Sequence, residues 1–114
     1  MIKFVVLSKL REGVDPDKWW KFWEEVYAPP HMVPGLIKYC INRVTKVVEG
    51  EATYWGMAEQ WFESEEALQA MFDSPKLHEV VEHRKRVFPD ATTNPMVVIM
   101  EEKIIVEDGV LLRR

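Results

Sequence analysis

The sequence predicts one α+β domain whose strands form a four-stranded antiparallel sheet. Short apolar runs of strand length lie near both ends of the chain, two alternating segments follow each other in the middle, and two amphipathic helical patterns separate them. The resulting order, β-α-β-β-α-β, is the ferredoxin-like pattern. A length of 114 residues suits one core but not two, so residues 1–114 are expected to be a single domain.

Residues 2–8 are the first predicted strand, because β-branched and other apolar side chains dominate this short run. A helix start follows at Asp15-Pro16, an acidic N-cap with proline at the first helical position. Apolar residues then recur as far as Tyr27 over an arc of about 160°, which predicts an amphipathic helix. Pro29 and the proline after it end this helix, since neither has an N–H to donate.

Residues 36–48 and 53–63 are the second and third predicted strands, joined by a polar turn. Alternation places Tyr39, Ile41 and Arg43 on one face of the second strand, and Gly56, Ala58 and Gln60 on one face of the third. Gly56 and Ala58 leave room on their face, either for a closely packed helix or for a ligand.

The second helical region is predicted to have two parts. Ser64 caps the first part, and Ser74 followed by Pro75 starts the second, which Pro89 ends. Residues 96–106 are the last predicted strand and are apolar on both faces.

The sheet face away from the helices is expected to be buried as well. The first and last strands are apolar on both faces, and a large exposed apolar patch is rare on a monomer. Two copies packed sheet against sheet would cover this face and close an α+β barrel. We therefore expect a homodimer, with Trp55 or Trp61 adding to the apolar face and with a ligand pocket that depends on the barrel.

Composition excludes several classes of partner. The net charge is −4 and no basic block is present, so nucleic acid is not an expected partner. Cys40 is the single cysteine, which rules out an internal disulfide and a zinc framework of paired cysteines, and fits a reduced, cytoplasmic setting. No signal-peptide pattern and no membrane-spanning apolar run occurs, so no membrane association is expected.

Several motifs follow one another at defined spacing along the chain. Trp23 and Pro29 mark the end of the first predicted helix, and Pro34-Gly35-Leu36 and Tyr39 follow in the next turn and strand. The third predicted strand runs into a helix start as Ala58-Glu59-Gln60-Trp61-Phe62-Glu63-Ser64-Glu65-Glu66-Ala67. Together these motifs resemble the EthD family of the dimeric α+β-barrel superfamily. The resemblance covers nearly the whole chain and implies a ferredoxin-like domain that dimerises into a barrel.

The chain also departs from that family's pattern. Tyr27 stands where members most often have histidine, and His31, four residues later, is a candidate to supply the imidazole from the loop. A more distant similarity to methylmuconolactone isomerases includes a tyrosine matching Tyr39. Those enzymes have a cysteine at the position of Gln60 and a histidine near Tyr27, so this isomerase activity is not expected here.

The candidate catalytic residues are His31, Tyr39 and Tyr27, and the candidate substrate-binding residues are Arg43, Gln60, Trp23, Ile41, Ala58 and His78. An imidazole can move protons near neutral pH, whereas a tyrosine is a poor base but a good hydrogen-bond donor. The structural alternatives are an exposed loop histidine for His31 and a core tyrosine for Tyr39. His78 and His83 lie about 140° apart around a helix, so they are not expected to share a metal.

The resemblance implies an enzyme that acts on a small hydrophobic, oxygen-bearing compound of aromatic, polyketide or lactone type. Cofactor-independent acid–base chemistry such as isomerisation, cyclisation or dehydration is the expected reaction, in keeping with members linked to ether degradation. One alternative is a barrel that binds a hydrophobic ligand without turnover. Another is a haem-using monooxygenase of the same superfamily, with His78 as the candidate axial ligand. No cofactor or metal is expected for the leading assignment.

Overall fold

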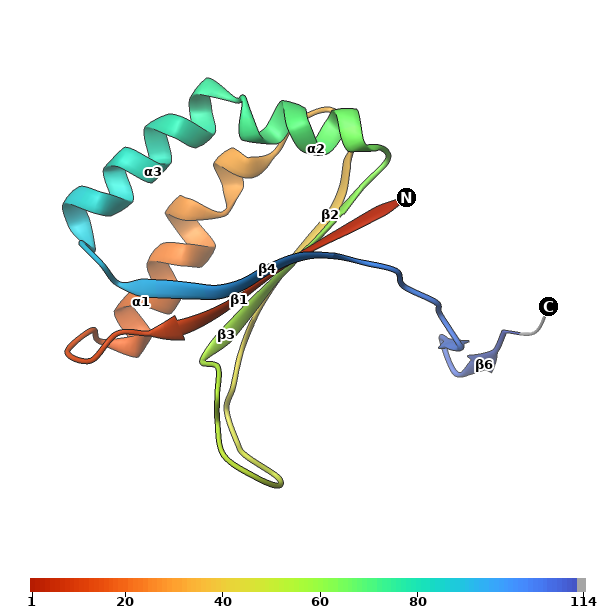
Figure 1. Ribbon diagram of the computed structural model, residues 1–114, viewed down its shortest axis with the longest axis horizontal. Helices are drawn as coiled ribbons and strands as arrows, with labels where there is room; N and C mark the ends of the chain where they lie inside the picture. Colours follow the sequence, from red (N-terminus) through yellow and green to blue (C-terminus); the bar gives the residue numbers. More distant parts are fainter. Residues whose placement is uncertain (113–114) are drawn as a thin grey trace.

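A computed structural model describes residues 1–112 as a four-stranded sheet with all its helices on one face (Figure 1). The strands are β1 (Ile2–Leu10), β2 (Leu36–Arg43), β3 (Gly56–Phe62) and β4 (Thr92–Met100). They pair antiparallel in the order β2-β3-β1-β4. The predicted α+β, ferredoxin-like fold is thus confirmed.

The helical segments are α1 (Pro16–Phe22), η1 (Trp23–Tyr27), η2 (Pro29–His31), α2 (Glu65–Phe72) and α3 (Pro75–Val87). Asp15, Ser64 and Ser74 cap α1, α2 and α3, each accepting from backbone N–H groups of the first turn. The prediction of one regular helix to Tyr27 was wrong in its last turn. There the chain widens into a π-helical turn, η1, in which the Ala28 N–H donates to the Trp23 carbonyl at 2.8 Å.

The strands are also shorter or shifted relative to their predicted ranges. β2 ends at Arg43 and β3 begins at Gly56, and the connection between them extends away from the sheet (Figure 1). β4 ends at Met100 rather than at residue 106, because Met100 pairs with Lys3 and β1 offers almost no partner beyond that point. The chain then forms a small exposed hairpin, β5 (Val106–Glu107) and β6 (Val110–Leu111), which projects from the body.

The core fills the space between the sheet and the helices. Phe4 and Phe62 pack there against Leu68 and Met71 of α2, while Trp19 and Trp23 pack over the other half of the sheet. Trp55 belongs to this second cluster, 6.2 Å from Trp23 between ring centroids, so its expected place on the bare face was wrong. Trp61 does face away from the helices, with the Lys3 ammonium 4.8 Å from the centre of its ring.

The bare face mixes apolar and charged side chains. Lys3 forms 2.8 Å ion pairs with both Glu59 and Glu102, and Glu59 accepts a hydrogen bond from Asn42 at 2.9 Å. Val5 and Val98 form an apolar cross-strand pair on the same face. This face is therefore less apolar than the sequence suggested. Within residues 1–112, no helix has the length and hydropathy needed to cross a membrane.

Candidate functional site

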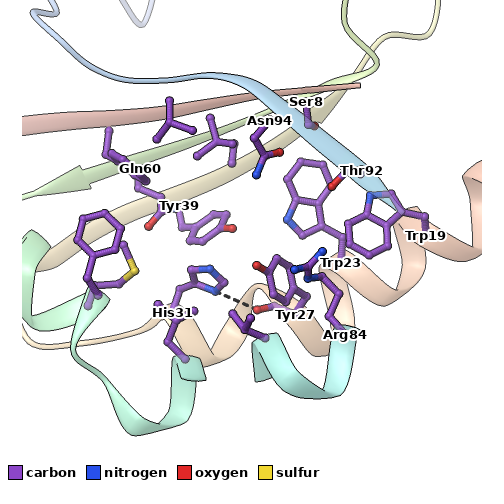
Figure 2. Close-up of a pocket in the computed structure, with 18 residues that line it drawn as sticks. Ser8, Trp19, Trp23, Tyr27, His31, Tyr39, Gln60, Arg84, Thr92 and Asn94 are labelled. Carbon is purple, nitrogen blue, oxygen red and sulfur yellow. Dashed lines mark hydrogen bonds between the residues drawn. The ribbon is translucent and has the colours of Figure 1, made fainter. Parts of the chain in front are cut away.

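A cavity of about 270 Å³ lies between the helices and the sheet, and a single chain builds it. It opens on the helix-covered face, so it does not involve the bare face on which the expected barrel pocket would depend. Figure 2 shows side chains from the sheet, from α1 and the turns after it, and from α3 converging on this space. Phe72 and Val97 line it and are 41% and 51% exposed, which places its mouth between the end of α2 and the edge strand β4.

His31 projects from η2 into this cavity and is only 7% exposed. Its Nδ1 lies 2.9 Å from the Tyr27 carbonyl and 3.1 Å from the Ala28 carbonyl. A carbonyl can only accept, so Nδ1 must carry the proton and Nε2 keeps its lone pair. Burial lowers the pKa of His31 below its ordinary value of 6.5, so the neutral imidazole dominates at neutral pH.

The local sequence explains why His31 is held so firmly. The last carbonyls of a helix have no intrahelical partner, and Pro29 and Pro30 have no N–H with which to satisfy them. The His31 backbone N–H donates to Ala28 at 3.0 Å, and the imidazole serves both the Tyr27 and Ala28 carbonyls. The imidazole thus caps the helix end and is fixed in one tautomer.

Tyr27 and Tyr39 flank the imidazole edge-on. The ring centroids lie 5.1 Å apart for Tyr27 and His31 and 5.3 Å apart for His31 and Tyr39. Burial raises the pKa of both tyrosines, so both remain protonated phenols that can donate a hydrogen bond but cannot act as bases. The positive charge of Arg84 partly opposes the rise in the pKa of Tyr27.

Gln60, Trp23 and Ala58 complete the predicted residues that line the cavity. Gln60 pairs across the strands with Tyr39 and is 2% exposed, and its Oε1 has no hydrogen-bond partner among residues 1–112. A buried amide oxygen without a partner is costly, so this atom is a natural contact for a ligand hydroxyl. The two small residues on β3 leave room for different groups. Gly56 makes room for Trp23, since a Trp23 ring atom lies 3.4 Å from where a Cβ of Gly56 would stand, whereas Ala58 faces the cavity.

Three predicted binding residues do not line the cavity. Arg43 forms a 2.9 Å ion pair with Asp17, and its guanidinium lies 4.8 Å from the centre of the Trp20 ring. Ile41 packs into the tryptophan cluster beside the cavity. His78 is exposed on α3 and does not line the cavity, and its Nε2 donates to the Phe72 carbonyl at 2.7 Å.

Arg84 and Trp19 are cavity residues that the sequence did not suggest as site residues. The Arg84 guanidinium lies 5.5 Å from the centre of the Tyr27 ring, and Trp19 is 6.1 Å from the same ring. A signal for Arg84 was present, because it occupies the apolar stripe of α3 together with Leu77 and Val81. In the described part of the chain, no group of three or more His, Cys, Asp or Glu side chains could hold a metal ion.

The structure thus combines a ferredoxin-like α+β domain, a largely apolar cavity with an exposed mouth, and a buried histidine held by two backbone carbonyls. The family model of the EthD domain matches residues 11–92, which is most of the chain. The chain therefore belongs to the EthD family.

Solved structures support the fold. An EthD family protein from Bacillus halodurans is 21% identical, with a TM-score of 0.67 and coverage of 90% of this chain and 99% of that one. A hydroxynitrile lyase from Passiflora edulis is 17% identical, with a TM-score of 0.62 and coverage of 87% and 88%. A dimeric ferredoxin-like protein of unknown function from Thermobifida fusca is 15% identical, with a TM-score of 0.61 and coverage of 87% and 86%. None of the curated proteins matches the sequence.

Proposed function

We propose that this chain is an EthD-type enzyme that performs cofactor-independent acid–base chemistry on a small hydrophobic, oxygen-bearing compound. The single observation that carries this proposal is the His31 imidazole, whose Nδ1–H is fixed by two carbonyls while Nε2 remains available beside a cavity. The hydroxynitrile lyase among the structural neighbours supports an enzymatic use of this fold.

The size of the cavity limits the substrate. An apolar cavity of about 150 Å³ accepts benzene in a well-studied engineered protein. A volume of about 270 Å³ therefore leaves room for one substituted ring, with further length only through the mouth at Phe72 and Val97. This favours a monocyclic phenol, ketone or lactone over a larger polycyclic compound.

The reaction proposed for this site is a proton transfer next to a carbonyl. Nε2 of His31 removes a proton from the carbon beside the substrate carbonyl, the C–H electron pair forms the C=C bond of an enolate, and the negative charge moves to oxygen. The Tyr39 hydroxyl, kept protonated by burial, donates a hydrogen bond to that oxygen. Where a C=C bond adjoins the carbon that loses the proton, the enolate is a dienolate, and return of the proton from Nε2–H to its far carbon shifts the C=C bond into conjugation with the carbonyl. The isomerisation is then complete without any other reactant.

The direct test is proton exchange in D₂O, followed by NMR on a panel of monocyclic ketones, phenols and lactones. We expect catalysed loss of the C–H signal beside the carbonyl, and a fall of about 10²–10⁴-fold in His31→Gln. His83→Gln is the matched control, because His83 lies on α3 and does not line the cavity. If His31→Gln catalysed proton exchange as fast as the wild type, the assigned role of His31 would be wrong.

The proposed working form is a homodimer packed through the bare face of the sheet. The dimeric neighbour from Thermobifida fusca supports this assembly, as do the partly exposed side chains of Leu7, Met57 and Val98 on that face. In contrast to the cavity, which one chain builds, the barrel would need both chains. A barrel that binds its ligand without turnover is the outcome expected if binding persists while no exchange is found.

A further inference from the structure

The polar side chains of the cavity form a row with hydrogen-bond donors at one end and an acceptor at the other. From Arg84 the row passes to the Tyr27 ring at 5.5 Å, then to His31 at 5.1 Å and to Tyr39 at 5.3 Å. Gln60 stands opposite Tyr39 on the neighbouring strand. Figure 2 shows the same order, with Trp19, Arg84 and Thr92 on one side of the cavity and Gln60 on the other.

The donor end has two nitrogens that nothing satisfies. Nε1 of Trp19 and Nε of Arg84 are buried and have no hydrogen-bond partner among residues 1–112. Trp19 is 3% exposed, so water reaches it hardly at all. Both side chains contact the Tyr27 ring, which places them at the same end of the cavity.

The positive charge of Arg84 at this end of the cavity also lacks a counter-ion among the described residues. Within the described residues Arg84 forms no ion pair, and no Asp or Glu lines the cavity. The other arginine that the sequence suggested for binding, Arg43, is already neutralised by Asp17. A guanidinium that is partly withdrawn from water without a counter-ion attracts a planar anion, because its fork of N–H groups matches a carboxylate.

We infer that the Arg84 end of the cavity is a carboxylate subsite and that the substrate is a monocyclic acid carrying a hydroxyl at its far end. Arg84, assisted by the Trp19 indole N–H, takes the carboxylate. The Gln60 amide oxygen accepts from the hydroxyl, and the ring lies between them beside His31. This inference rests on the proposed function, because it places the substrate ring next to His31 as the base. It concerns the binding of the substrate and not its conversion.

The test compares three monocyclic probes of similar size by titration of the intrinsic tryptophan fluorescence. The probes are 4-hydroxybenzoate, its neutral amide 4-hydroxybenzamide, and benzoate, which lacks the hydroxyl. We expect the wild type to bind 4-hydroxybenzoate about tenfold or more tightly than the amide, because a hydrogen bond to a charged group is stronger than a neutral one. Benzoate should also bind more weakly, since it leaves Gln60 Oε1 without a partner.

Arg84→Met should remove the preference for the acid over the amide, and Gln60→Leu should remove the preference for 4-hydroxybenzoate over benzoate. Arg86→Met is the matched control, because Arg86 is an exposed arginine on the same helix and carries the same charge. It should leave both preferences unchanged. Arg84→Lys keeps the charge but not the fork and should give an intermediate preference, which also guards against a methionine variant that fails to fold.

Equal affinity of the wild type for the acid and the amide would overturn the subsite, as would an unchanged preference in Arg84→Met. These binding results do not depend on turnover. If His31→Gln had no effect on proton exchange while Arg84→Met lost the preference, the proposed chemistry would fail and the subsite would stand. The reverse pattern would reject the subsite and keep the chemistry.

Discussion

His31 couples the stability of the fold to pH. Burial lowers its pKa below 6.5, so the unfolded chain takes up a proton at a higher pH than the folded chain does. The stabilising contribution of the neutral imidazole is complete above about 6.5 and is lost as the pH falls through the folded-state pKa.

Urea unfolding at a series of pH values from 7.5 downward measures this coupling. The free energy of unfolding of the wild type should fall more steeply below about pH 6.5 than that of His31→Gln, which cannot take up this proton. His83→Gln should follow the wild type. Parallel curves for the wild type and His31→Gln would show that His31 does not carry the pH dependence.

Gly56 and Ala58 lie two residues apart on one strand face. Substitution of Gly56 should lower the stability of the fold, whereas substitution of Ala58 should weaken ligand binding. A Cβ at Gly56 would stand 2.8 Å from the Asn42 carbonyl oxygen, so Gly56→Ala should lower the free energy of unfolding by about 1–3 kcal/mol. Ala58→Leu points into the cavity and should keep its stability while weakening 4-hydroxybenzoate binding at least about tenfold, since it occupies the ligand's space.

Chemical denaturation and fluorescence titration of both variants give the two quantities. Full binding by Ala58→Leu would show that ligands do not bind in the cavity, and unchanged stability of Gly56→Ala would show that the close approach to the Asn42 carbonyl is unimportant.

The sequence pointed to part of the site for physical reasons that individual residues illustrate. Alternation within each strand grouped Tyr39 with Ile41 on β2 and Gln60 with Ala58 on β3, and the antiparallel register of the two strands brings Tyr39 and Gln60 to one face. Alternation alone could not show that Arg43 would form an ion pair with Asp17, twenty-six positions away, and therefore would not line the cavity. Nor could alternation show that Arg84, which lies in the apolar stripe of α3, would be the cation that lines the cavity. That depends on how α3 packs against Tyr27.

At the scale of the elements, the π-helical turn η1 is what the helical pattern did not predict. Periodicity reports which residues are apolar, and the aromatic stripe continues to Tyr27 in either geometry. The wider turn follows from the Ala28 N–H reaching back to Trp23 and from the two prolines that follow. Next to this turn, the Tyr27 and Ala28 carbonyls both accept from the His31 imidazole and so orient it.

The turn into β2 depends on Gly35, which has a φ of +91°. A Cβ there would lie 2.6 Å from the Ala67 Cβ of α2, so the turn and the helix pack without space between them. Gly35→Ala should therefore cost the positive-φ penalty of about 1–2 kcal/mol and an overpacking penalty of about 1–3 kcal/mol in addition.

Gly50→Ala is the matched control, because Gly50 has a φ of +80° but nothing within 4 Å of its would-be Cβ. It should show the first penalty only. Thermal and urea unfolding of the two variants give the difference, and equal losses would mean that the contact with Ala67 is unimportant.

The order of strands in the whole molecule was predictable because the element sequence leaves few topologies open. The place of the cavity was harder to predict. The sequence tied the pocket to a barrel between two chains, whereas the structure forms a cavity under the helices of one chain. Hydrophobic patterning marks a face as buried but does not say whether a helix, a ligand or a second copy covers it.

The assembly of the whole molecule leads to the last prediction. Leu7, Met57 and Val98 are partly exposed apolar residues of the bare face. The projecting hairpin after β4 exposes Ile105, Val106 and Val110. Burial of this surface between two copies would cover about 2,000 Å² or more, the range of obligate dimers. Light scattering at low micromolar concentration should then give twice the 13.4 kDa of one chain, and the melting temperature should rise with protein concentration.

Val98→Asp should shift the protein towards monomer because it buries an unpaired charge. Val48→Asp, at a position that is 93% exposed on the β2–β3 connection, should remain dimeric. A wild-type monomer, or a Val98→Asp dimer as stable as the wild type, would show that the bare face is not the interface, while the cavity within one chain would be unaffected.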